Sequence, residues 1–300
     1  MAGFKLLTYF SPTTPRAGVL IGETVFDAEE LLAGHGFVDT TTTLGLLRQW
    51  SNCLPVLNKL SETHPPLVGT AISSIKLAAP ILYPGAIFCV ASNYYDHSRE
   101  MNPEKEPAKE GKEPYFFLKA PAHTTIGPGS PIRLPTVSKQ VDWEIELGVV
   151  IGREASAMTV DNAMSCVAGY TIMNDLSLRD LGRRKDWPFV SDWLGQKVFE
   201  GSAPMGPWIV PADEIKDLHS VPLKLWVNDS LMQNATTENM VFSVAEQIEY
   251  LSRRLTLRPG DVIATGTPAG VGKPRGIFLK SGDHVRMEIG GIGSMEHPVI

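Results

Sequence analysis

Carboxylates at alternate positions mark the segment Val141–Ile151, which reads VDWEIELGVVI. Alternate side chains of a β-strand lie on one face, so Asp142, Glu144 and Glu146 are predicted to point the same way. The rest of the segment is apolar, which favours a buried strand. Like charges on a partly buried face repel one another and lose hydration, so a positive charge is expected to offset them.

A second apolar stretch, GYTIMND, ends in another carboxylate, Asp175. Glu144, Glu146 and Asp175 would together supply the hard oxygen ligands that Mg²⁺, Mn²⁺ or Ca²⁺ prefers. Zinc is disfavoured because clustered Cys and His ligands are missing from the sequence. The alternative is an ordinary half-exposed strand whose charges face water, and the strand pattern alone leaves both interpretations open.

His97 and Glu100 stand three residues apart in SNYYDHSRE, where a strand is predicted to pass through a polar turn into a short helix. At this helical spacing the two side chains are neighbours, and a carboxylate that orients an imidazole makes it a general base. The alternative is a helix start with solvated charges. The charged, Pro-rich residues 101–114 that follow predict either a lid over a substrate or a long surface loop.

The glycine-rich run ATGTPAGVGK ends at Lys273 and resembles a phosphate loop only superficially. It lacks the Walker spacing, and Lys273 is followed by Pro274 instead of Ser or Thr. We interpret it as a strand-end loop whose backbone N–H groups and Thr267 hydroxyl face a small anion such as a carboxylate. A plain glycine-rich turn is the alternative.

Composition places the chain among ordinary globular proteins, with 300 residues, 43% hydrophobic and 20% charged. A net charge of −6 argues against nucleic acid or an anionic membrane as the main partner. We expect neither a signal peptide nor a membrane-spanning helix. Three cysteines without a CxxC pair favour a reducing compartment, and we predict a cytoplasmic protein.

The predicted fold class is α+β, mainly β. Residues 1–78 predict a small N-terminal α/β domain, and residues 79–300 predict a catalytic domain built on a rolled mixed β-sheet. The clearest helix is Val241–Leu255, whose apolar positions recur at helical spacing. Strands of the larger domain are predicted at residues 86–91, 115–119, 144–151, 168–174, 224–227, 262–265 and 285–289.

Eight runs, in this order, resemble the fumarylacetoacetate hydrolase family over residues 79–300. They are SNYYDHSRE, FFLKAP, VDWEIELGVVIG, GYTIMNDLSLRD, PMGPWIV, LWVN, LTLRPGDVIATGTPAGVG and LKSGDHV. The resemblance is to its acylpyruvate hydrolase and 2-oxo-hepta-3-ene-1,7-dioate isomerase-like members. It implies a rolled-sheet catalytic domain, a homodimer, and Mg²⁺ or Mn²⁺ held by Glu144, Glu146 and Asp175.

The same resemblance implies roles for further residues. It places a catalytic dyad on His97 and Glu100, further catalytic positions on Lys119 and Lys197, and substrate contacts on Arg179, Thr267 and Tyr94. Two departures from the family pattern lie near the expected pocket. Gly182 stands where many members have a substrate-facing glutamine, and the usual Gly-Lys pair is here Gly195-Gln196-Lys197.

The function implied is hydrolysis of a C–C bond in a 2,4-diketo acid of the acylpyruvate, fumarylpyruvate or maleylpyruvate type, in aromatic catabolism. The metal would chelate the 2-oxo acid end while His97, oriented by Glu100, activates water. The alternative is an oxaloacetate-type decarboxylase or an unsaturated oxo-acid isomerase with the same ligands. A third hypothesis is a non-catalytic binding protein. The expected partner is a small oxo or diketo acid.

Overall fold

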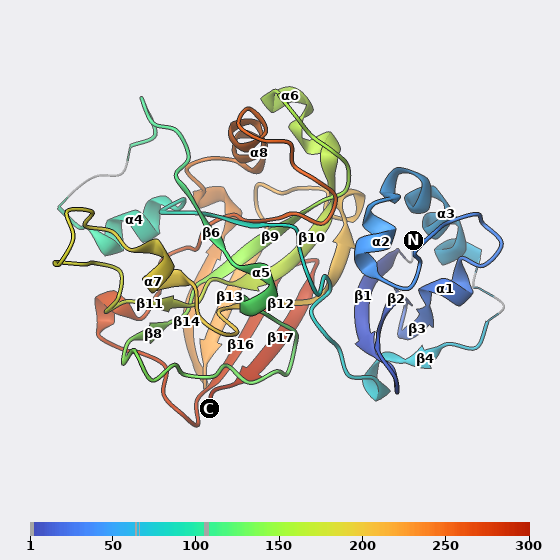
Figure 1. The fold of residues 1–300 in the computed structure, drawn as a ribbon, viewed down its shortest axis with the longest axis horizontal. Coiled ribbons are helices and arrows are strands. Elements are labelled where there is room, and N and C mark those ends of the chain that lie inside the picture. Colours follow the sequence, from blue (N-terminus) through green and yellow to red (C-terminus); the bar gives the residue numbers. More distant parts are fainter. Residues whose placement is uncertain (1–2, 64, 66, 105–107) are drawn as a thin grey trace.

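The computed structural model describes residues 3–63, 65, 67–104 and 108–300. A mixed sheet of eleven strands runs through the molecule, with the short β7 (Thr125–Ile126) pairing with β12 outside the main path (Figure 1). The main path is, in spatial order, β4 (Thr70–Ala71), β3 (Thr24–Asp27), β2 (Pro15–Ile21), β1 (Phe4–Phe10), β12 (Ala203–Pro211), β10 (Val167–Asn174), β9 (Ile145–Ile151), β15 (Val262–Ala264), β5 (Ile87–Val90) and β6 (Phe116–Lys119).

Two smaller sheets complete the β structure. A four-stranded sheet has the order β14 (Ser230–Thr236), β13 (Pro222–Val227), β16 (His284–Ile289), β17 (Gly293–Pro298), and β8 (Val141–Asp142) pairs with β11 (Ser177–Leu178). Buried and more exposed residues alternate along β16, as expected when one face of an antiparallel sheet covers a core. The mainly β, α+β fold with a mixed sheet is therefore confirmed, although the sequence had not indicated β12, β14 or β17.

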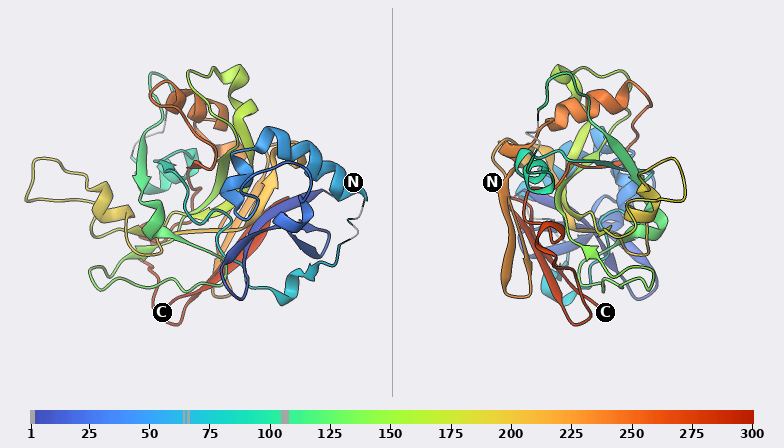
Figure 2. Two further views of the ribbon diagram at one scale, coloured as in Figure 1. Left: turned by 45° about the vertical axis from the view of Figure 1, so that its right-hand side comes forward. Right: turned by 90° about the vertical axis from the view of Figure 1, so that its left-hand side faces the viewer.

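Most of the helices are short, and α3 is the longest of those described (Figures 1 and 2). They are α1 (Ala28–Leu31), α2 (Thr43–Leu47), α3 (Trp50–Thr63), α4 (Tyr95–Met101), α5 (Pro121–Thr124), α6 (Val160–Ala163), α7 (Trp193–Lys197) and α8 (Val244–Ser252). Within the described ranges, none of these helices combines the length and apolar character needed to cross a membrane.

Helix α8 is shorter than the predicted helix 241–255 because its start is fixed by a capping box. Ser243 Oγ accepts the Glu246 N–H at 3.3 Å, and the Glu246 carboxylate accepts the Ser243 N–H at 2.8 Å. These bonds satisfy backbone donors that a helix start leaves open. The predicted apolar face is confirmed, with Val244, Ile248 and Leu251 buried.

The N-terminal strands and helices form the unit on the right of Figure 1. Strand β1 pairs antiparallel with β12, with Leu6 opposite Ile209, so this unit continues the main sheet. The predicted domain boundary between residues 78 and 79 stays a prediction.

The predicted single strand over residues 144–151, with its extension back to residue 141, is interrupted. Trp143 N–H bonds the Asp142 carboxylate at 2.9 Å, and Glu144 N–H bonds Asn174 Oδ1 at 2.9 Å. These side chains take donors that a strand ladder would need, so β8 ends at Asp142 and β9 begins at Ile145. The prediction that Asp142 shares one strand face with Glu144 and Glu146 is therefore wrong.

Strands β9 and β10 are neighbours, which brings the predicted ligands together. They pair antiparallel, with Glu146 opposite Met173 and Ile145 opposite Asn174. Every residue of both strands is buried. Asp175 follows β10 directly, and its N–H donates to Glu144 O at 2.9 Å, so the register itself places the carboxylates side by side.

Candidate metal centre and active site

Three buried carboxylates form a compact cluster at the end of β9 and β10. Glu144, Glu146 and Asp175 each offer an oxygen, and these oxygens all lie within 4.8 Å of one another. Their exposed fractions are only 4%, 1% and 1%, so water does little to offset their charge. The interpretation as a solvated strand face is therefore wrong for these three residues.

The Lys197 ammonium contacts two carboxylates of the cluster. Its Nζ lies 2.6 Å from Glu144 Oε2 and 2.5 Å from Asp175 Oδ2. Burial alone would lower the pKa of Lys197, but Asp175 and Glu144 raise it, which keeps the group charged. Helix α7 therefore ends by placing a cation between two of the predicted metal ligands.

Lys119, the last residue of β6, lies beside the cluster, but all of its N–H donors bind backbone carbonyls. Its Nζ donates to three backbone carbonyls, those of Leu176 (3.0 Å), Lys197 (2.6 Å) and Ser202 (2.8 Å). An ammonium has three N–H donors, so these bonds use them all. Asp175 Oδ1 also lies 2.9 Å from this Nζ, as an ion pair outside hydrogen-bond alignment. Lys119 thus fixes Asp175 and contributes charge.

Arg179 and Asp142 form a second layer beside Glu144. Arg179 Nε donates to Asp142 Oδ2 at 2.7 Å, and its Nη2 donates to Glu144 Oε1 at 2.5 Å. Asp142 also accepts the N–H groups of Gly272 (2.7 Å) and Lys273 (3.1 Å). Two of the three guanidinium nitrogens are thereby engaged by the protein, and Asp142 ties Arg179 to the glycine-rich loop.

Glu144 and Glu146 are held in opposite electrostatic environments. Burial would raise the pKa of Glu144, but Lys197 and Arg179 hold it well below its ordinary value. Burial raises the pKa of Glu146 well above its ordinary value, and Asp175 and Glu144 raise it further. The charged form of Glu146 is thus disfavoured, although Lys197 and the Gly266 N–H offset part of this effect.

This residue set fits a hard divalent cation. All three ligands are carboxylates, which is the donor chemistry of Mg²⁺ and Mn²⁺ sites, and they already converge without a change of backbone. A divalent cation there would stabilise the ionised form of Glu146, which burial and the neighbouring carboxylates disfavour. Glu144, Glu146 and Asp175 are therefore the residues that would hold it.

His97 and Glu100 meet on α4 as the sequence predicts. His97 Nδ1 lies 3.3 Å from Glu100 Oε1, and the imidazole is buried. Glu100 also accepts the N–H of Gly270 at 2.9 Å and of Val271 at 3.3 Å. Burial would raise the pKa of Glu100, but the bonds from His97 and these N–H groups lower it overall. The ring is thus oriented through Nδ1, which leaves Nε2 for chemistry.

His97 and the carboxylate cluster line the same cavity of about 190 Å³, and Glu100 contacts His97 from outside the lining. Thr267 lines it as well, but its hydroxyl donates to Ile145 O and accepts from Gln233, each at 2.8 Å. The remaining lining residues are Val90, Ala91, Ser92, Met101, Phe117, Arg179, Trp193, Gln196, Lys197 and Lys273.

The N–H groups of the glycine-rich loop do face anions, but these are the protein's own carboxylates. Gly266 N–H donates to Glu146 Oε2 at 2.7 Å, and Gly270 and Gly272 donate to Glu100 and Asp142. Gly270 has a φ of +109°, and a Cβ there would collide with the Met232 carbonyl. The predicted use of these groups for an external anion is corrected accordingly.

Tyr94 is buried away from this cavity. Its side chain is 0% exposed, it is not among the residues that line the cavity, and within the described chain its hydroxyl has no hydrogen-bond partner. Its predicted substrate contact is therefore not placed at the cavity surface.

Gln233 is a positioning residue that the sequence reasoning missed. Its Oε1 accepts the Ile145 N–H at 3.0 Å, and its Nε2 donates to Thr267 Oγ1 and Pro268 O, each at 2.8 Å. It thereby joins the start of β9 to the glycine-rich loop. Gln233 lies between Met232 and Asn234 on β14, and the sequence carries no signal for this role.

The predicted lid is tied to α8 by ion pairs. Lys109 Nζ lies 2.6 Å from Glu246 Oε1, and Glu113 pairs with Arg253 at 3.0 Å and Arg254 at 3.1 Å. Residues 105–107 of the predicted segment 101–114 lie outside the described residues. Whether the segment closes over a substrate stays a prediction.

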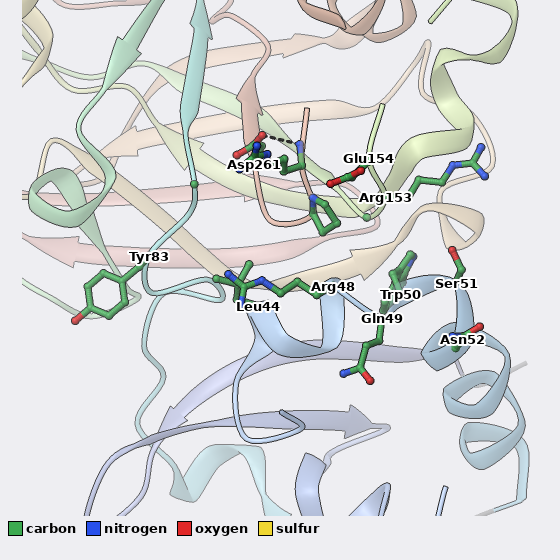
Figure 3. A pocket seen from close by; sticks show the side chains of 14 residues that line it. Leu44, Arg48, Gln49, Trp50, Ser51, Asn52, Tyr83, Arg153, Glu154 and Asp261 are labelled. Carbon is green, nitrogen blue, oxygen red and sulfur yellow. Dashed lines mark hydrogen bonds between the residues drawn. The ribbon is translucent and has the colours of Figure 1, made fainter. Parts of the chain in front are cut away.

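A larger cavity lies elsewhere, between the N-terminal unit and the main sheet. It has a volume of about 740 Å³, and residues of α2 and α3 face Arg153, Glu154 and Asp261 across it (Figure 3). Its two acidic residues come with no third His, Cys, Asp or Glu in the lining. By volume alone this cavity would be the candidate active site. The buried carboxylates and His97 instead indicate that the smaller cavity is the active site.

Comparison with known proteins assigns the family. Residues 86–300 match the model described as fumarylacetoacetate (FAA) hydrolase C-terminal. This chain belongs to the fumarylacetoacetate hydrolase family. Among curated relatives in the family, the mitochondrial oxaloacetate tautomerase fahd2 of Xenopus laevis is 42% identical over 231 residues, covering 76% of this chain and 69% of the relative.

Solved structures of the family also match over nearly the whole chain. Maleylpyruvate hydrolase from Sphingobium sp. SYK-6, in complex with manganese (II) ion and pyruvate, is 28% identical with a TM-score of 0.78, covering 99% of this chain and 98% of that one. A 2-hydroxyhepta-2,4-diene-1,7-dioate isomerase from Mycobacterium marinum is 29% identical with a TM-score of 0.73, covering 99% and 98%. The fold and family are thus shared by proteins named for different reactions.

Proposed function

We propose that this protein catalyses the keto–enol tautomerisation of a short 2-oxo acid, with oxaloacetate as substrate and Mg²⁺ or Mn²⁺ as cofactor. The observation that carries the proposal is that the carboxylate cluster and His97, which Glu100 contacts, line one small cavity. The relative in Xenopus laevis, named an oxaloacetate tautomerase, supports the choice of substrate.

Tautomerisation moves a proton from C3 of the oxo acid to its C2 carbonyl oxygen. A cation held by Glu144, Glu146 and Asp175 supplies Lewis-acid polarisation of a carbonyl. His97 Nε2 takes the proton from C3, while Glu100 fixes the ring through Nδ1 and stabilises its charged form. The Lys197 ammonium makes hydrogen bonds to Glu144 and Asp175 with all three donors, so it contributes positive charge beside the oxygen on which negative charge develops, and the protonated His97 ring returns the proton to that oxygen.

A second candidate is C–C bond hydrolysis of a 2,4-diketo acid. The same His97–Glu100 pair fits the activation of a water molecule, and the manganese-bound relative is named a maleylpyruvate hydrolase. Decarboxylation of oxaloacetate would need the same cluster without an attacking water. These reactions differ in products, so one set of assays separates them.

The test is a parallel assay of oxaloacetate, acetylpyruvate and maleylpyruvate with protein loaded with Mg²⁺ or Mn²⁺. We expect faster decay of the oxaloacetate enol absorbance with no release of pyruvate or CO₂. Cleavage of acetylpyruvate or maleylpyruvate without an effect on the enol would overturn the proposal in favour of the hydrolase. Release of pyruvate and CO₂ from oxaloacetate would favour the decarboxylase. Protein carrying Glu146→Gln serves as the matched control.

The homodimer and the cytoplasmic location stay proposals. Light scattering of the purified protein tests the first, and cell fractionation tests the second.

A further inference from the structure

The cations that line the active cavity are not equally free to bind a substrate. Lys197 is engaged by Glu144 and Asp175, and Arg179 is engaged by Asp142 and Glu144. Lys273 differs, because in the described part of the chain its ammonium takes part in no ion pair or hydrogen bond. Only its backbone N–H is used, by Asp142.

Lys273 is exposed and lines the same cavity as the buried cluster, so it lies at the rim. Its position is fixed because Asp142 accepts the N–H groups of both Gly272 and Lys273. Partial burial lowers the pKa of Lys273, and Arg179 and Arg183 lower it further, so positive groups gather at this rim. Such a rim attracts an anionic group that does not reach the cluster.

Gln196 supplies a polar group to the same cavity. It stands on α7 directly before Lys197, and no hydrogen bond of its side-chain amide is found among the described residues. A carboxamide half-buried without a partner at a cavity wall is suited to hydrogen-bond a ligand oxygen.

Gly182 makes room for this amide. A Cβ at Gly182 would collide with Gln196 Oε1 and would lie 2.9 Å from its Cδ. The Gly182 carbonyl also accepts the Asp192 N–H at 3.1 Å, and Asp192 caps α7 through the Gly195 N–H at 2.8 Å. A side chain at position 182 would therefore displace the flexible Gln196 amide from its present place, whereas glycine leaves that place open.

We propose that Gln196 and Lys273 bind the distal carboxylate of a dicarboxylic 2-oxo acid, with Gly182 providing the space that seats the amide. The inference rests on the proposed function, because it assumes that the 2-oxo acid end lies at the carboxylate cluster. It makes the site selective for a substrate with a negative charge at both ends.

The experiment measures binding, so that it is independent of turnover. Calorimetry on Mg²⁺-loaded protein compares 3,3-difluorooxaloacetate, which keeps both carboxylates but has no C3 hydrogen to lose, with oxalate, which has no distal chain. Lys273→Met and Gln196→Ala are expected to weaken difluorooxaloacetate binding by about tenfold or more and to leave oxalate binding unchanged, since a hydrogen bond to a charged group is lost. Lys280→Met, an exposed lysine of the following segment, is the matched control.

The contact between Gly182 and Gln196 has its own test. Gly182→Ala should weaken difluorooxaloacetate binding in the wild-type background and have no further effect in the Gln196→Ala background, because the displaced amide is then already absent. An equal loss in both backgrounds would show that Gly182→Ala acts by disturbing the fold, and would overturn this part of the proposal.

The outcomes separate the two proposals. If the variants weaken difluorooxaloacetate selectively but the wild type does not tautomerise oxaloacetate, the proposed function falls and the distal site stands. If oxaloacetate is tautomerised but the variants bind both probes as the wild type does, the distal site falls. Wild-type protein that binds oxalate and not difluorooxaloacetate also overturns the distal site.

Discussion

The inner wall and the rim of the active cavity are built in different ways. The inner wall is Glu146 in β9, Glu144 directly before β9 and Asp175 directly after β10, and the register of these two fully buried strands brings their oxygens together. The rim, Gln196 and Lys273, stands on a short helix and a loop, and its polar ends have no partner among the described residues.

This difference allows one fold to keep its reaction type at the inner wall while the rim varies with the substrate. Substitution of one residue in a buried charge cluster leaves another charge uncompensated, which lowers the free energy of unfolding by several kcal/mol. A rim residue that meets solvent can change with little effect on folding. Next to the rim, residues 182–192 project from the body (Figure 2), and their tip includes the exposed Trp187 and Phe189.

The largest effect should come from the inner wall. Glu146→Gln should reduce Mg²⁺ and Mn²⁺ affinity by more than about 100-fold. Mutation of residues that only hydrogen-bond a metal ligand already lowers metal affinity by about 10–100-fold, and loss of a ligand should cost more. Tautomerisation should fall with the metal affinity. Because Asp175 and Glu144 repel Glu146, the metal-free variant should melt at a higher temperature than metal-free wild type. Calorimetry and thermal melting measure both, and unchanged metal binding would contradict the assignment.

A substitution in the His97–Glu100 pair should lower the catalytic rate without changing metal affinity. His97→Ala should lower kcat by about 10²–10⁴-fold, the usual worth of a general base, with metal affinity within twofold of wild type, or roughly 0.4 kcal/mol. His123→Ala, at an exposed histidine, is the matched control. Full turnover by His97→Ala would place the base elsewhere.

Gln233 tests how the inner wall is held. Gln233→Leu leaves the Ile145 N–H and the Pro268 carbonyl buried without a partner, so the free energy of unfolding should fall by about 2 kcal/mol. Asn234→Leu, on the exposed side of the same strand, should change it by less than about 0.5 kcal/mol. Urea titration measures both, and equal effects would argue against the positioning role.

Acid should loosen the contact between α4 and the glycine-rich loop. The pKa of Glu100 is lowered in the folded protein, so its stabilising contribution is complete above its unfolded pKa of about 4.3 and is lost as the pH falls through the folded value. Wild type should therefore lose more unfolding free energy than Glu100→Gln between pH 6 and pH 3, roughly spanning that window. Parallel pH dependence of the two proteins would contradict the role of this carboxylate.

The smallest effect should come from the projecting segment. Phe189 is 77% exposed, so Phe189→Ser should change the free energy of unfolding by less than about 0.5 kcal/mol and leave metal affinity unchanged. A large loss of stability would mean that this tip is packed against another molecule in solution.

Local sequence patterns determined the parts of this protein that depend on near neighbours. The apolar runs of β9 and β10 predicted buried strands, and the spacing of His97 and Glu100 predicted their contact, because each depends on a repeat of the backbone itself. The ordered family motifs added the metal ligands, which no single strand pattern could establish.

Tertiary structure alone decided which partner each polar group has. Asp142 follows the same alternation as Glu144 and Glu146, yet it binds Arg179 and the loop at Gly272 because the backbone breaks after it. Neither Gln233 nor Lys273 belongs to a sequence pattern that predicts its role. In the folded chain, the Gln233 side chain binds segments that are distant in sequence, whereas the Lys273 ammonium has no partner among the described residues. Hydrogen bonds and charge compensation depend on distances in space, and the sequence order of this protein does not contain those distances.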